Sequence, residues 1–593
     1  MNDIRQNIKT LRLELLQRNL DAMYISGTDP HSGEYLTDHW QIRAFISGFT
    51  GTSGIVVITQ EEAGLWTDSR YFLQAADQLK GSGIKMYKLR VPDAVIPEIW
   101  LSKKLPPGSK VGFDPRTLTV SGYRALNNSL EPAGIIMIET PDIIDKIWQN
   151  RPELPNDEIY EFPTEYAGSS RKNKRELVCN ELKKLDADIQ IITTTDEVAW
   201  LFNLRGSDVK YNPVFTGFGV IGKGVCILFT DNAKIPSPLK IKLEKEKIKL
   251  LEYAEFYTWL KSVKESNIYI DPSAANYAVF KTVCADNQII EGLSVISLLK
   301  AVKNPVELRG FRQAVKKDSV ALTEFLYWLK QNLQSGEITE YTAGIKMAEF
   351  RSLQSGYKGE SFAPIAGYKE HGAVVHYCAI EREALTLRED GILLFDSGGH
   401  YLNGTTDITR TVALGPVTER QRSDFTYVLK GLIALSEAVF PQGTRGWQID
   451  ALARTALWKN GLNYGHGTGH GIGHFLNVHE GPVSIRHDCS EIPLSSGMVF
   501  SNEPGLYREE EYGIRIENIL ECVKKEETEF GTFLGFETLT LFPVDINLIE
   551  TKLLNGEEKK WINRYHKRVN AEIKPLLRKE LHKFFDSLTT EID

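Results

Sequence analysis

The sequence lacks the long apolar runs of a membrane protein. No stretch of about 18 apolar residues, the length that crosses a bilayer, occurs among its 593 residues. The first 20 residues, MNDIRQNIKTLRLELLQRNL, carry charges throughout and have no apolar centre. This pattern argues against a secretory signal and indicates an amphipathic helix. We therefore expect a cytoplasmic protein with no membrane partner.

Paired cysteines and an excess of basic charge are also absent. The six cysteines are scattered, with no C-x-x-C pair, which favours reduced, mostly buried thiols over a disulfide framework or a zinc ribbon. The net charge of −8 and the pI near 6.0 provide no basic surface for nucleic acid. The composition, 42% hydrophobic and 25% charged, is that of an ordinary globular protein.

The length and the pattern of elements predict three domains, because one hydrophobic core does not extend over so long a chain. We expect an α/β domain over residues 1–155, a second α/β domain over 156–305 and a third domain over 306–593. A proline-rich linker at 151–166 separates the first two. The charged C-terminal tail, about 545–593, is expected to be a peripheral helical extension.

The first two domains share a sequence pattern. LDAMYISGTD (20–29) resembles LDADIQIITTTD (185–196), and the strand that leads into Asp68 resembles GVCILFTD (224–231). We interpret this as a duplication of one α/β domain. Chance similarity between two apolar strands that each end in Asp is the alternative.

The third domain combines amphipathic helices with strands. Apolar residues recur at helical spacing from Leu308 to Leu329. Thr418 and Gln421 form a capping box before a second helix, and a third helix over 447–459 stops at Asn-Gly. The strand-like stretches are GILLFDSGG, TRTVAL, GMVFSNEPG and GIRIENILE.

Histidine is concentrated in the third domain. Eight of the twelve histidines lie between His371 and His487. Histidine binds metals and carries protons near neutral pH, so the chemistry is expected in this stretch. Two aspartates lie there too: Asp396 ends the apolar run ILLFD, and Asp407 follows eleven residues later in GTTDITRT. A turn can bring two such carboxylates together, although either alone is more simply a turn residue.

The stretch YGHGTGHGIGHFLNVHEGP (464–482) places four histidines among closely spaced glycines. Each glycine disfavours a helix by about 1 kcal/mol and allows close approach to a ligand. The glycines do not fit G-x-G-x-x-G, and there is no G-K-[ST], which argues against a phosphate loop. H-E-x-x-H is absent, which excludes a zincin. A loop of exposed or hydrogen-bonded histidines is the remaining alternative.

Two glutamates complete the set of candidates: Glu503 in MVFSNEPG and Glu517 in GIRIENIL. A buried carboxylate is costly unless it is paired or binds a metal. For either Glu alone, a pair with an arginine such as Arg515 is the simpler interpretation. Together with Asp396 and Asp407, however, the four carboxylates offset the charge of two divalent ions, which can activate a water between them. Such oxygen-rich ligands, with one imidazole, favour Mn²⁺, with Co²⁺ or Zn²⁺ as alternatives.

The order and contexts of these motifs resemble the pita-bread metallopeptidases, which include methionine aminopeptidase, prolidase, aminopeptidase P and creatinase. The stretches GFTGTSG, LWTDSRYFLQA and WLFNLRGSDVKYNPVF extend the resemblance to the long, three-domain Xaa-Pro aminopeptidase type. The resemblance implies an α/β plus α+β fold class, with two creatinase-N-like α/β domains followed by a pita-bread catalytic domain.

The resemblance also implies roles for individual residues. Asp396 would bind one metal, Asp407 and Glu517 would bridge both, and His470 and Glu503 would complete the second. His376, in GAVVHY, would be the proton shuttle, although by itself it would pass as a core histidine. The other catalytic or substrate-binding positions would be Glu503 as proton acceptor, His466 and His479 in the pocket, and Arg515 and Tyr507 in support. His474 receives no role.

The expected activity is that of a dinuclear-metal aminopeptidase, a homodimer that hydrolyses the N-terminal Xaa-Pro bond of peptides through a metal-bridging hydroxide. A prolidase, which cleaves only Xaa-Pro dipeptides, is the nearest alternative, but prolidases resemble a two-domain plan. A non-catalytic peptide-binding module, or metal-free creatinase-like chemistry, is disfavoured because all five ligand positions are present.

Overall fold

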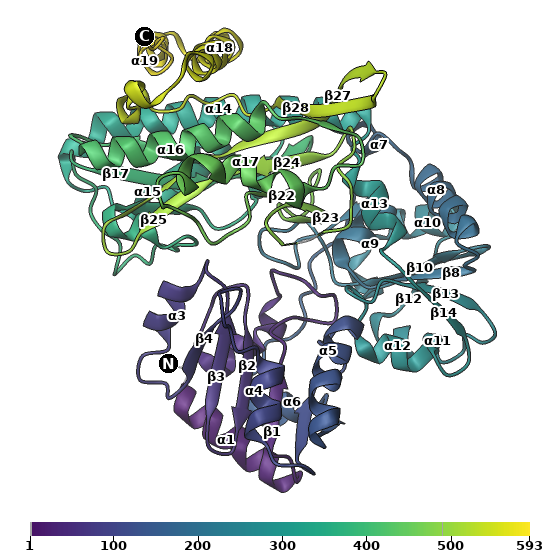
Figure 1. The fold of residues 1–593 in the computed structure, drawn as a ribbon. Coiled ribbons are helices and arrows are strands. Elements are labelled where there is room, and N and C mark those ends of the chain that lie inside the picture. Colours follow the sequence, from purple (N-terminus) through teal and green to yellow (C-terminus); the bar gives the residue numbers. More distant parts are fainter. Residues whose placement is uncertain (1–2, 489) are drawn as a thin grey trace. The chain divides into compact units, whose positions relative to one another are not determined.

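The computed structural model describes residues 3–488 and 490–593. The chain forms two compact units (Figure 1): Met1–Thr164 with Ser169–Leu298, and Glu165–Gly168 with Leu299–Asp593. Within the described ranges, no helix has both the length and the apolar character needed to cross a membrane.

The cysteines of the described residues form no disulfide, as the sequence predicted. Of the five cysteines that the structure describes, Cys226 and Cys522 are buried, whereas Cys284 and Cys378 are exposed. The expectation of mostly buried thiols is therefore wrong, and Cys489 lies outside the described residues.

The first unit contains two six-stranded sheets. The first has the order β4-β3-β2-β1-β5-β6, with strands β1 Ala22–Ile25, β2 Ile55–Thr59, β3 Ala63–Thr67, β4 Lys85–Lys88, β5 Lys110–Phe113 and β6 Ile136–Glu139. The second has the order β12-β11-β10-β8-β13-β14, with strands β8 Ile189–Ile192, β10 Phe218–Gly222, β11 Val225–Phe229, β12 Lys249–Leu251, β13 Asn267–Ile270 and β14 Gln288–Glu291.

The two sheets repeat one topology, strand for strand. In each, the central strand, β1 or β8, pairs antiparallel with one neighbour and parallel with the other. Beyond the antiparallel neighbour, the next two pairings are antiparallel (β2-β3 and β10-β11) and then parallel (β3-β4 and β11-β12). Beyond the parallel neighbour, the last pairing is parallel (β5-β6 and β13-β14). The two sequence similarities fall on equivalent strands, β1 with β8 and β3 with β11. The duplication predicted from the sequence is therefore confirmed.

Helices flank both sheets. The predicted N-terminal helix forms as α1, Ile4–Gln17, which Asp3 caps and which buries Ile8, Leu11 and Leu15. Its counterpart before the second sheet is α8, Arg171–Lys184. Within the predicted linker, β7 Tyr160–Glu161 pairs with β9 Leu204–Arg205. The other helices of this part are α2 Ile42–Ser47, α3 Phe72–Gln78, α4 Pro97–Lys104, α5 Val120–Leu130, α6 Ile143–Ile147, α9 Thr195–Leu201, α10 Ser237–Lys245, α11 Phe256–Leu260, α12 Tyr277–Val283 and α13 Val295–Ala301.

The second unit begins, apart from short α7 (Thr164–Ala167), with the long helix α14, Pro305–Asn332. Asn304 caps α14, and the predicted apolar positions face inward, with Phe311, Leu322 and Leu329 fully buried. The Thr418–Gln421 capping box is present before α16, Glu419–Ser436. The third predicted helix forms as α17, Gly446–Trp458, and α15 spans Glu340–Ser352.

Antiparallel sheets complete the second unit. One has the order β16-β17-β20, and a larger one has the order β21-β28-β27-β24-β22-β23. Beside them are the hairpin β25-β26 and the sheet β15-β18-β19. The strands are β15 Tyr357–Glu360, β16 Ile365–Tyr368, β17 Ile392–Ser397, β18 Gly399–Tyr401, β19 Gly404–Thr405, β20 Ile408–Ala413, β21 Val439–Pro441, β22 Gly469–Gly471, β23 Glu480–Ile485, β24 Val499–Asn502, β25 Gly505–Arg508, β26 Tyr512–Arg515, β27 Asn518–Thr528 and β28 Gly531–Thr538.

The sequence suggested that the stretch GIRIENILE forms one strand, but this prediction is wrong. The stretch divides into β26 and β27, with Ile516 and Glu517 between them. The division arises because the two halves pair with different partners: β26 with β25, and β27 with β24 and β28. Glu517 therefore stands at a bend between two sheets, where its backbone N–H donates to the carbonyl of Thr409.

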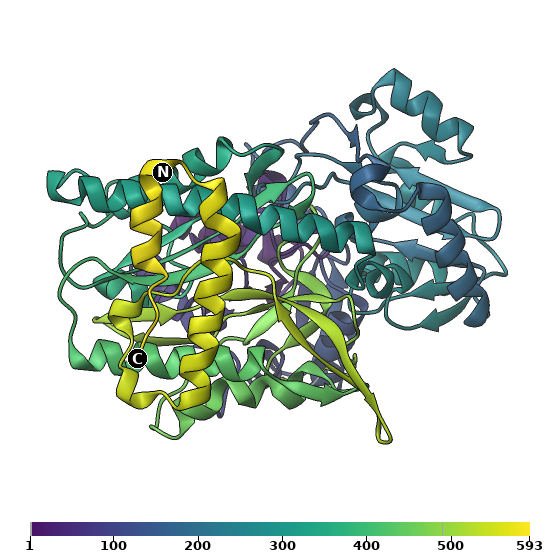
Figure 2. The ribbon, with the colours of Figure 1, turned by 90° about the horizontal axis from the view of Figure 1, so that it is seen from above.

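The C-terminal tail is helical, as predicted, but it is not peripheral. Its helices are α18, Gly556–Ile573, and α19, His582–Leu588. In Figure 2 they (yellow) lie across α14 (teal). One face of α18 enters a core cluster of the unit through Trp561, Ile562 and Tyr565. The tail is thus part of the folded core of the second unit.

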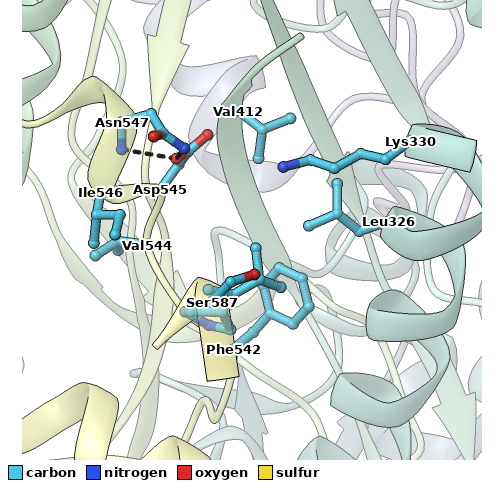
Figure 3. A pocket seen from close by; sticks show the side chains of 11 residues that line it. Leu326, Lys330, Val412, Phe542, Val544, Asp545, Ile546, Asn547 and Ser587 are labelled. Carbon is cyan, nitrogen blue, oxygen red and sulfur yellow. Dashed lines mark hydrogen bonds between the residues drawn. The ribbon is translucent and has the colours of Figure 1, made fainter. Parts of the chain in front are cut away.

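A small cavity of about 20 Å³ remains where the tail meets α14 (Figure 3). Leu326 and Lys330 of α14 and Ser587 of α19 line it, beside Asp545, whose carboxylate accepts a hydrogen bond from Asn547. This volume holds about one water. None of the predicted site residues lines it.

Candidate active site

Asp396 is positioned by the central strand of a three-stranded sheet. It lies opposite Thr409 of β20 and Ile365 of β16. Its Oδ2 accepts a hydrogen bond from Arg515 at 2.6 Å, while its buried Oδ1 has no protein partner. A buried carboxylate oxygen that no protein donor satisfies is costly, so Oδ1 is suited to a metal ligand.

Asp407 and His470 face each other from different sheets. Asp407 precedes β20 and is 4% exposed, and His470 is the middle residue of β22. His470 Nε2 lies 3.4 Å from Oδ2 of Asp407 and 3.7 Å from Oε1 of Glu503. The other ring nitrogen, Nδ1, is 3.0 Å from the carbonyl oxygen of Gly471.

The Gly471 carbonyl fixes the tautomer of His470. A carbonyl only accepts hydrogen bonds, so Nδ1 carries the proton, and in the neutral ring Nε2 presents its lone pair to Asp407 and Glu503. A lone pair directed at two carboxylates requires a cation between them or a second proton on the ring. A ligand histidine that donates its other N–H to a carbonyl is the usual arrangement at metal sites.

Glycines shape the segment around His470, but for a different reason from the one the sequence suggested. A side chain at Gly469 would collide with the Ser501 carbonyl of the adjacent strand, and one at Gly471 would collide with the Glu480 carbonyl. These glycines therefore let β22 pack between β23 and β24 in the sheet. The segment forms no helix, as its glycine content predicted.

The two glutamates differ in exposure. Glu517 is 1% exposed, and its Oε2 accepts a hydrogen bond from the Thr409 hydroxyl at 2.8 Å. Glu503 directly follows β24, is held by its N–H to the Thr468 carbonyl, and leaves 21% of its side chain exposed. Glu503 is thus the more accessible of the two to solvent and substrate.

The carboxylates destabilise one another's charges. Burial, followed by the charges of Asp396 and Glu503, raises the pKa of Asp407 well above its usual value. Burial, followed by Asp407 and Asp396, does the same to the pKa of Glu517. Ligand atoms of Asp407, His470 and Glu517 lie within 4.8 Å of one another. These residues fit divalent cations, which would remove the repulsion and satisfy the oxygens.

A hydrogen-bonded chain of side chains joins the carboxylates to His466. Arg515 donates to Asp396, to Thr409 at 3.1 Å and to the Tyr507 hydroxyl at 2.7 Å. The Tyr507 hydroxyl in turn lies 2.8 Å from Nε2 of His466. Nδ1 of His466 donates to the Gly467 carbonyl, so Nε2 accepts from Tyr507. Burial raises the pKa of Tyr507 to about 12, which keeps its hydroxyl protonated.

The remaining predicted histidines lie in the same unit. The ring of His479 is 4.4 Å from that of His470, nearly perpendicular to it. His376 is half-buried in a turn after the short helix η6 (Lys369–Ala373), which packs against β25 and β26. His474, which received no role, is buried, and its Nε2 donates to the Asn403 carbonyl at 3.0 Å. It therefore ties the glycine-rich segment to the turn that precedes Asp407.

Several supporting residues were missed from the sequence. Thr409 contacts both Arg515 and Glu517, and it lies within the TTDITRT motif, which was its only signal. Arg454 of α17 pairs with Asp450 and donates to the carbonyls of Tyr464 and His466, so α17 holds the start of the glycine-rich segment. An Asp–Arg pair one helical turn apart is common on helices and does not by itself indicate such a role.

Comparison with known proteins covers nearly the whole chain. Residues 309–524 match metallopeptidase family M24, and 532–592 match its C-terminal region. Residues 7–147 and 150–307 each match the creatinase/prolidase N-terminal domain. The expected fold class, two creatinase-N-like domains followed by a pita-bread domain, is confirmed.

Individual relatives agree with this assignment. A probable Xaa-Pro aminopeptidase P of Laccaria bicolor is 39% identical over 97% of this chain and 91% of its own length. The crystal structure of X-prolyl aminopeptidase from Caenorhabditis elegans, a cytosolic enzyme with a di-nuclear active site, superposes over 100% of both chains with a TM-score of 0.96 and 35% identity. A prolidase from Pyrococcus horikoshii shares only the fold, at 20% identity over 63% of this chain and 99% of its own, with a TM-score of 0.50.

The similarity to the first two relatives extends through both creatinase-like domains and the catalytic domain, whereas the prolidase matches less than two thirds of the chain. The chain therefore belongs to metallopeptidase family M24, as a member of its three-domain Xaa-Pro aminopeptidase P group.

Proposed function

We propose that the protein removes the N-terminal residue from peptides with proline at the second position, in a metal-dependent hydrolysis. The observation that carries this is the cluster in which Asp407, His470 and Glu517 converge beside Asp396 and Glu503. Burial, followed by the neighbouring carboxylate charges, raises the pKa values of Asp407 and Glu517. Such a cluster is stable near neutral pH when cations share it.

Two divalent ions are proposed for the site, with Mn²⁺ favoured by the oxygen-rich ligands. The residues that would hold them are Asp396, Asp407, His470, Glu503 and Glu517. Bound there, the ions would supply Lewis-acid polarisation of the scissile carbonyl and would lower the pKa of water.

The chain's own groups would move the protons. Glu503 borders the ligand cluster and keeps part of its side chain exposed, so it is placed to take a proton from the attacking water. His376 is proposed to carry a proton on the substrate side. His466, held by Tyr507, and His479, beside His470, would line the pocket and steady the charged intermediate.

The preference for proline follows from the scissile bond. An Xaa-Pro bond is a tertiary amide with no N–H to donate, so recognition depends on a pocket for the ring. The test is kcat/KM on Arg-Pro-Pro, Arg-Pro and Arg-Ala-Pro, combined with metal analysis of the purified protein. We expect Arg-Pro-Pro to be cleaved best and Arg-Ala-Pro not at all. A preference for Arg-Pro would indicate a prolidase, and rapid cleavage of Arg-Ala-Pro would indicate a general aminopeptidase.

A homodimer remains part of the proposal, as does a cytoplasmic location like that of the nematode relative. Exposed apolar side chains of α17 support the dimer: Trp447, Leu452 and Trp458 are 39%, 39% and 50% exposed. Trp447 and Trp458 lie about three helical turns apart on one side of α17, and exposed aromatic side chains are enriched at association surfaces. Light-scattering mass of the wild type and of a Trp447→Ser, Trp458→Ser variant tests it, because a monomeric wild type contradicts the proposal.

A further inference from the structure

Glu340 is a fully buried carboxylate outside the proposed metal site. It is the first residue of α15, and its side chain is 0% exposed. It accepts four hydrogen bonds of 2.8 Å, from the backbone N–H groups of Tyr368 and Leu385, Nδ1 of His371 and the hydroxyl of Tyr377. A carboxylate has about four lone-pair sites. A single side chain thus satisfies donors spread over eighteen residues of one segment.

The donors bracket the turn that carries His376. The Val374 N–H donates to the His371 carbonyl at 3.1 Å, and the Tyr377 N–H donates to the Val374 carbonyl at 3.0 Å. These are two successive turns, and His376 lies inside the second. The side chains at the outer ends, His371 and Tyr377, both bind Oε2 of Glu340.

The two side chains at the ends of these turns, His371 and Tyr377, also pack against each other. The rings of His371 and Tyr377 lie 4.6 Å apart. The hydrogen bond to Glu340 raises the pKa of His371, because the carboxylate favours the protonated ring. Apart from η6, residues 369–391 form no helix or strand, so their position depends on contacts such as these.

We propose that Glu340 is a positioning residue, whose carboxylate fixes the two turns between His371 and Tyr377 so that His376 is held in one orientation for proton transfer. The inference rests on the proposed function, since orientation matters only if His376 acts in the reaction. Displacing a reacting group by about 1 Å can cost about 10²-fold in rate. Glu340 therefore contributes to turnover without touching substrate.

The test is a double-mutant cycle with Glu340→Gln and His376→Ala. Glutamine keeps the shape, but its NH₂ group cannot accept a hydrogen bond, so at least one donor loses its partner. We expect Glu340→Gln alone to lower kcat by at least about 10-fold, with KM within about 3-fold and metal content unchanged. In the His376→Ala background, Glu340→Gln should lower kcat by less than about 2-fold, because both changes remove the same contribution to turnover.

Asp318→Asn is the matched control. Asp318 is a buried carboxylate of the same unit, paired with Arg351 and hydrogen-bonded to Tyr401. Its loss should destabilise the fold while remaining additive with His376→Ala. If Glu340→Gln lowers kcat by the same factor in the wild type and in His376→Ala, Glu340 is only a structural residue and the proposal is overturned.

Hydrogen–deuterium exchange provides a readout that does not need activity. In Glu340→Gln, peptides covering residues 368–385 should exchange faster, while those covering 464–482 should not change. Unchanged exchange at 368–385 overturns the proposal even in an active enzyme. Faster exchange there, in a protein whose wild type fails to cleave Arg-Pro-Pro, would reject the proposed function and leave the ordering role of Glu340 supported.

Discussion

Arg515 Nη2 donates to Oδ2 of Asp396 at 2.6 Å, and the same guanidinium donates to Tyr507 at 2.7 Å. A carboxylate proposed to bind a metal is thereby connected to a tyrosine and, through it, to His466. Burial lowers the pKa of Arg515, but Tyr507, Asp396 and Glu503 outweigh it and raise the pKa well above its usual value. Arg515 is therefore a permanent cation at the edge of the site.

Removing the hydroxyl of Tyr507 should disconnect His466 from this chain. We expect Tyr507→Phe to keep its metal and its thermal stability within a few degrees, while kcat/KM falls by about 10-fold. The reason is that the hydroxyl loses both the charge-assisted hydrogen bond from Arg515 and the hydrogen bond to His466. The control is Tyr512→Phe on the paired strand β26, whose hydroxyl donates to Asp424 instead. Equal activity losses in the two variants would show that the effect belongs to the hairpin and not to His466.

Glu517 should be essential for metal binding. Chelation should abolish activity, and Mn²⁺ should restore it best. Glu517→Ala should behave like the chelated enzyme, because a ligand proposed to bridge two ions serves both. Metal content by mass spectrometry is the measurement, with Glu521→Ala, a buried glutamate of β27 paired with Arg312, as the control. Full activity of metal-free protein would contradict the whole assignment.

His376 should act without binding metal. His376→Ala should retain near-normal metal content and stability but lose about 10²–10⁴-fold in kcat, the usual contribution of a positioned acid–base group. Val375→Ala, in the same turn, controls for local disturbance. If His376→Ala instead unfolds readily while its folded fraction keeps normal specific activity, His376 is only a packing residue.

Protonation of His566 should destabilise the catalytic unit in acid. Burial lowers the pKa of His566 to about 4, and the unfolded value is about 6.5. The unfolded chain therefore binds the proton first as the pH falls. The contribution of neutral His566 to the free energy of unfolding is fully present above about pH 6.5. It is lost progressively towards pH 4, by at most about 3 kcal/mol.

Urea denaturation at a series of pH values tests this with His566→Gln, which keeps a hydrogen-bond acceptor for the Val544 N–H. The midpoints give the free energy of unfolding of each protein. The difference in this free energy between wild type and variant should change by up to about 3 kcal/mol between pH 7 and pH 4. A pH-independent difference would mean that His566 does not titrate on unfolding.

Local sequence patterns predicted much of the catalytic fold. The Thr418–Gln421 box marked the start of α16, and the spacing from Leu308 to Leu329 marked α14, because caps and helical periodicity are short-range properties. The break at Glu517 was missed, since apolar residues on both sides hide a change of pairing partner. The tail was misjudged because its charges dominate the sequence while Trp561 and its neighbours face the core. The domain boundaries near 155 and 305 stay predictions.

Part of the candidate site could likewise be predicted from the sequence, and part could not. The five proposed ligands were identified from their motifs, and the structure brings Asp407, His470 and Glu517 together. The contacts of Glu340 could not be predicted, because its partners lie 28 to 45 residues away in a segment of little regular structure. Side chains that support a site through long-range hydrogen bonds leave no local pattern.

The packing of the tail has a consequence for biosynthesis. One core cluster of the second unit draws on residues from Val320 to Phe585, which lie 265 positions apart in the sequence. Domains fold as units while the chain emerges from the ribosome at about 5–20 residues per second. The two creatinase-like domains can fold as soon as they have emerged, but the core of the second unit cannot close until Phe585 has also emerged. Until then the apolar side chains of this core stay exposed, and such transiently exposed surface is prone to aggregate.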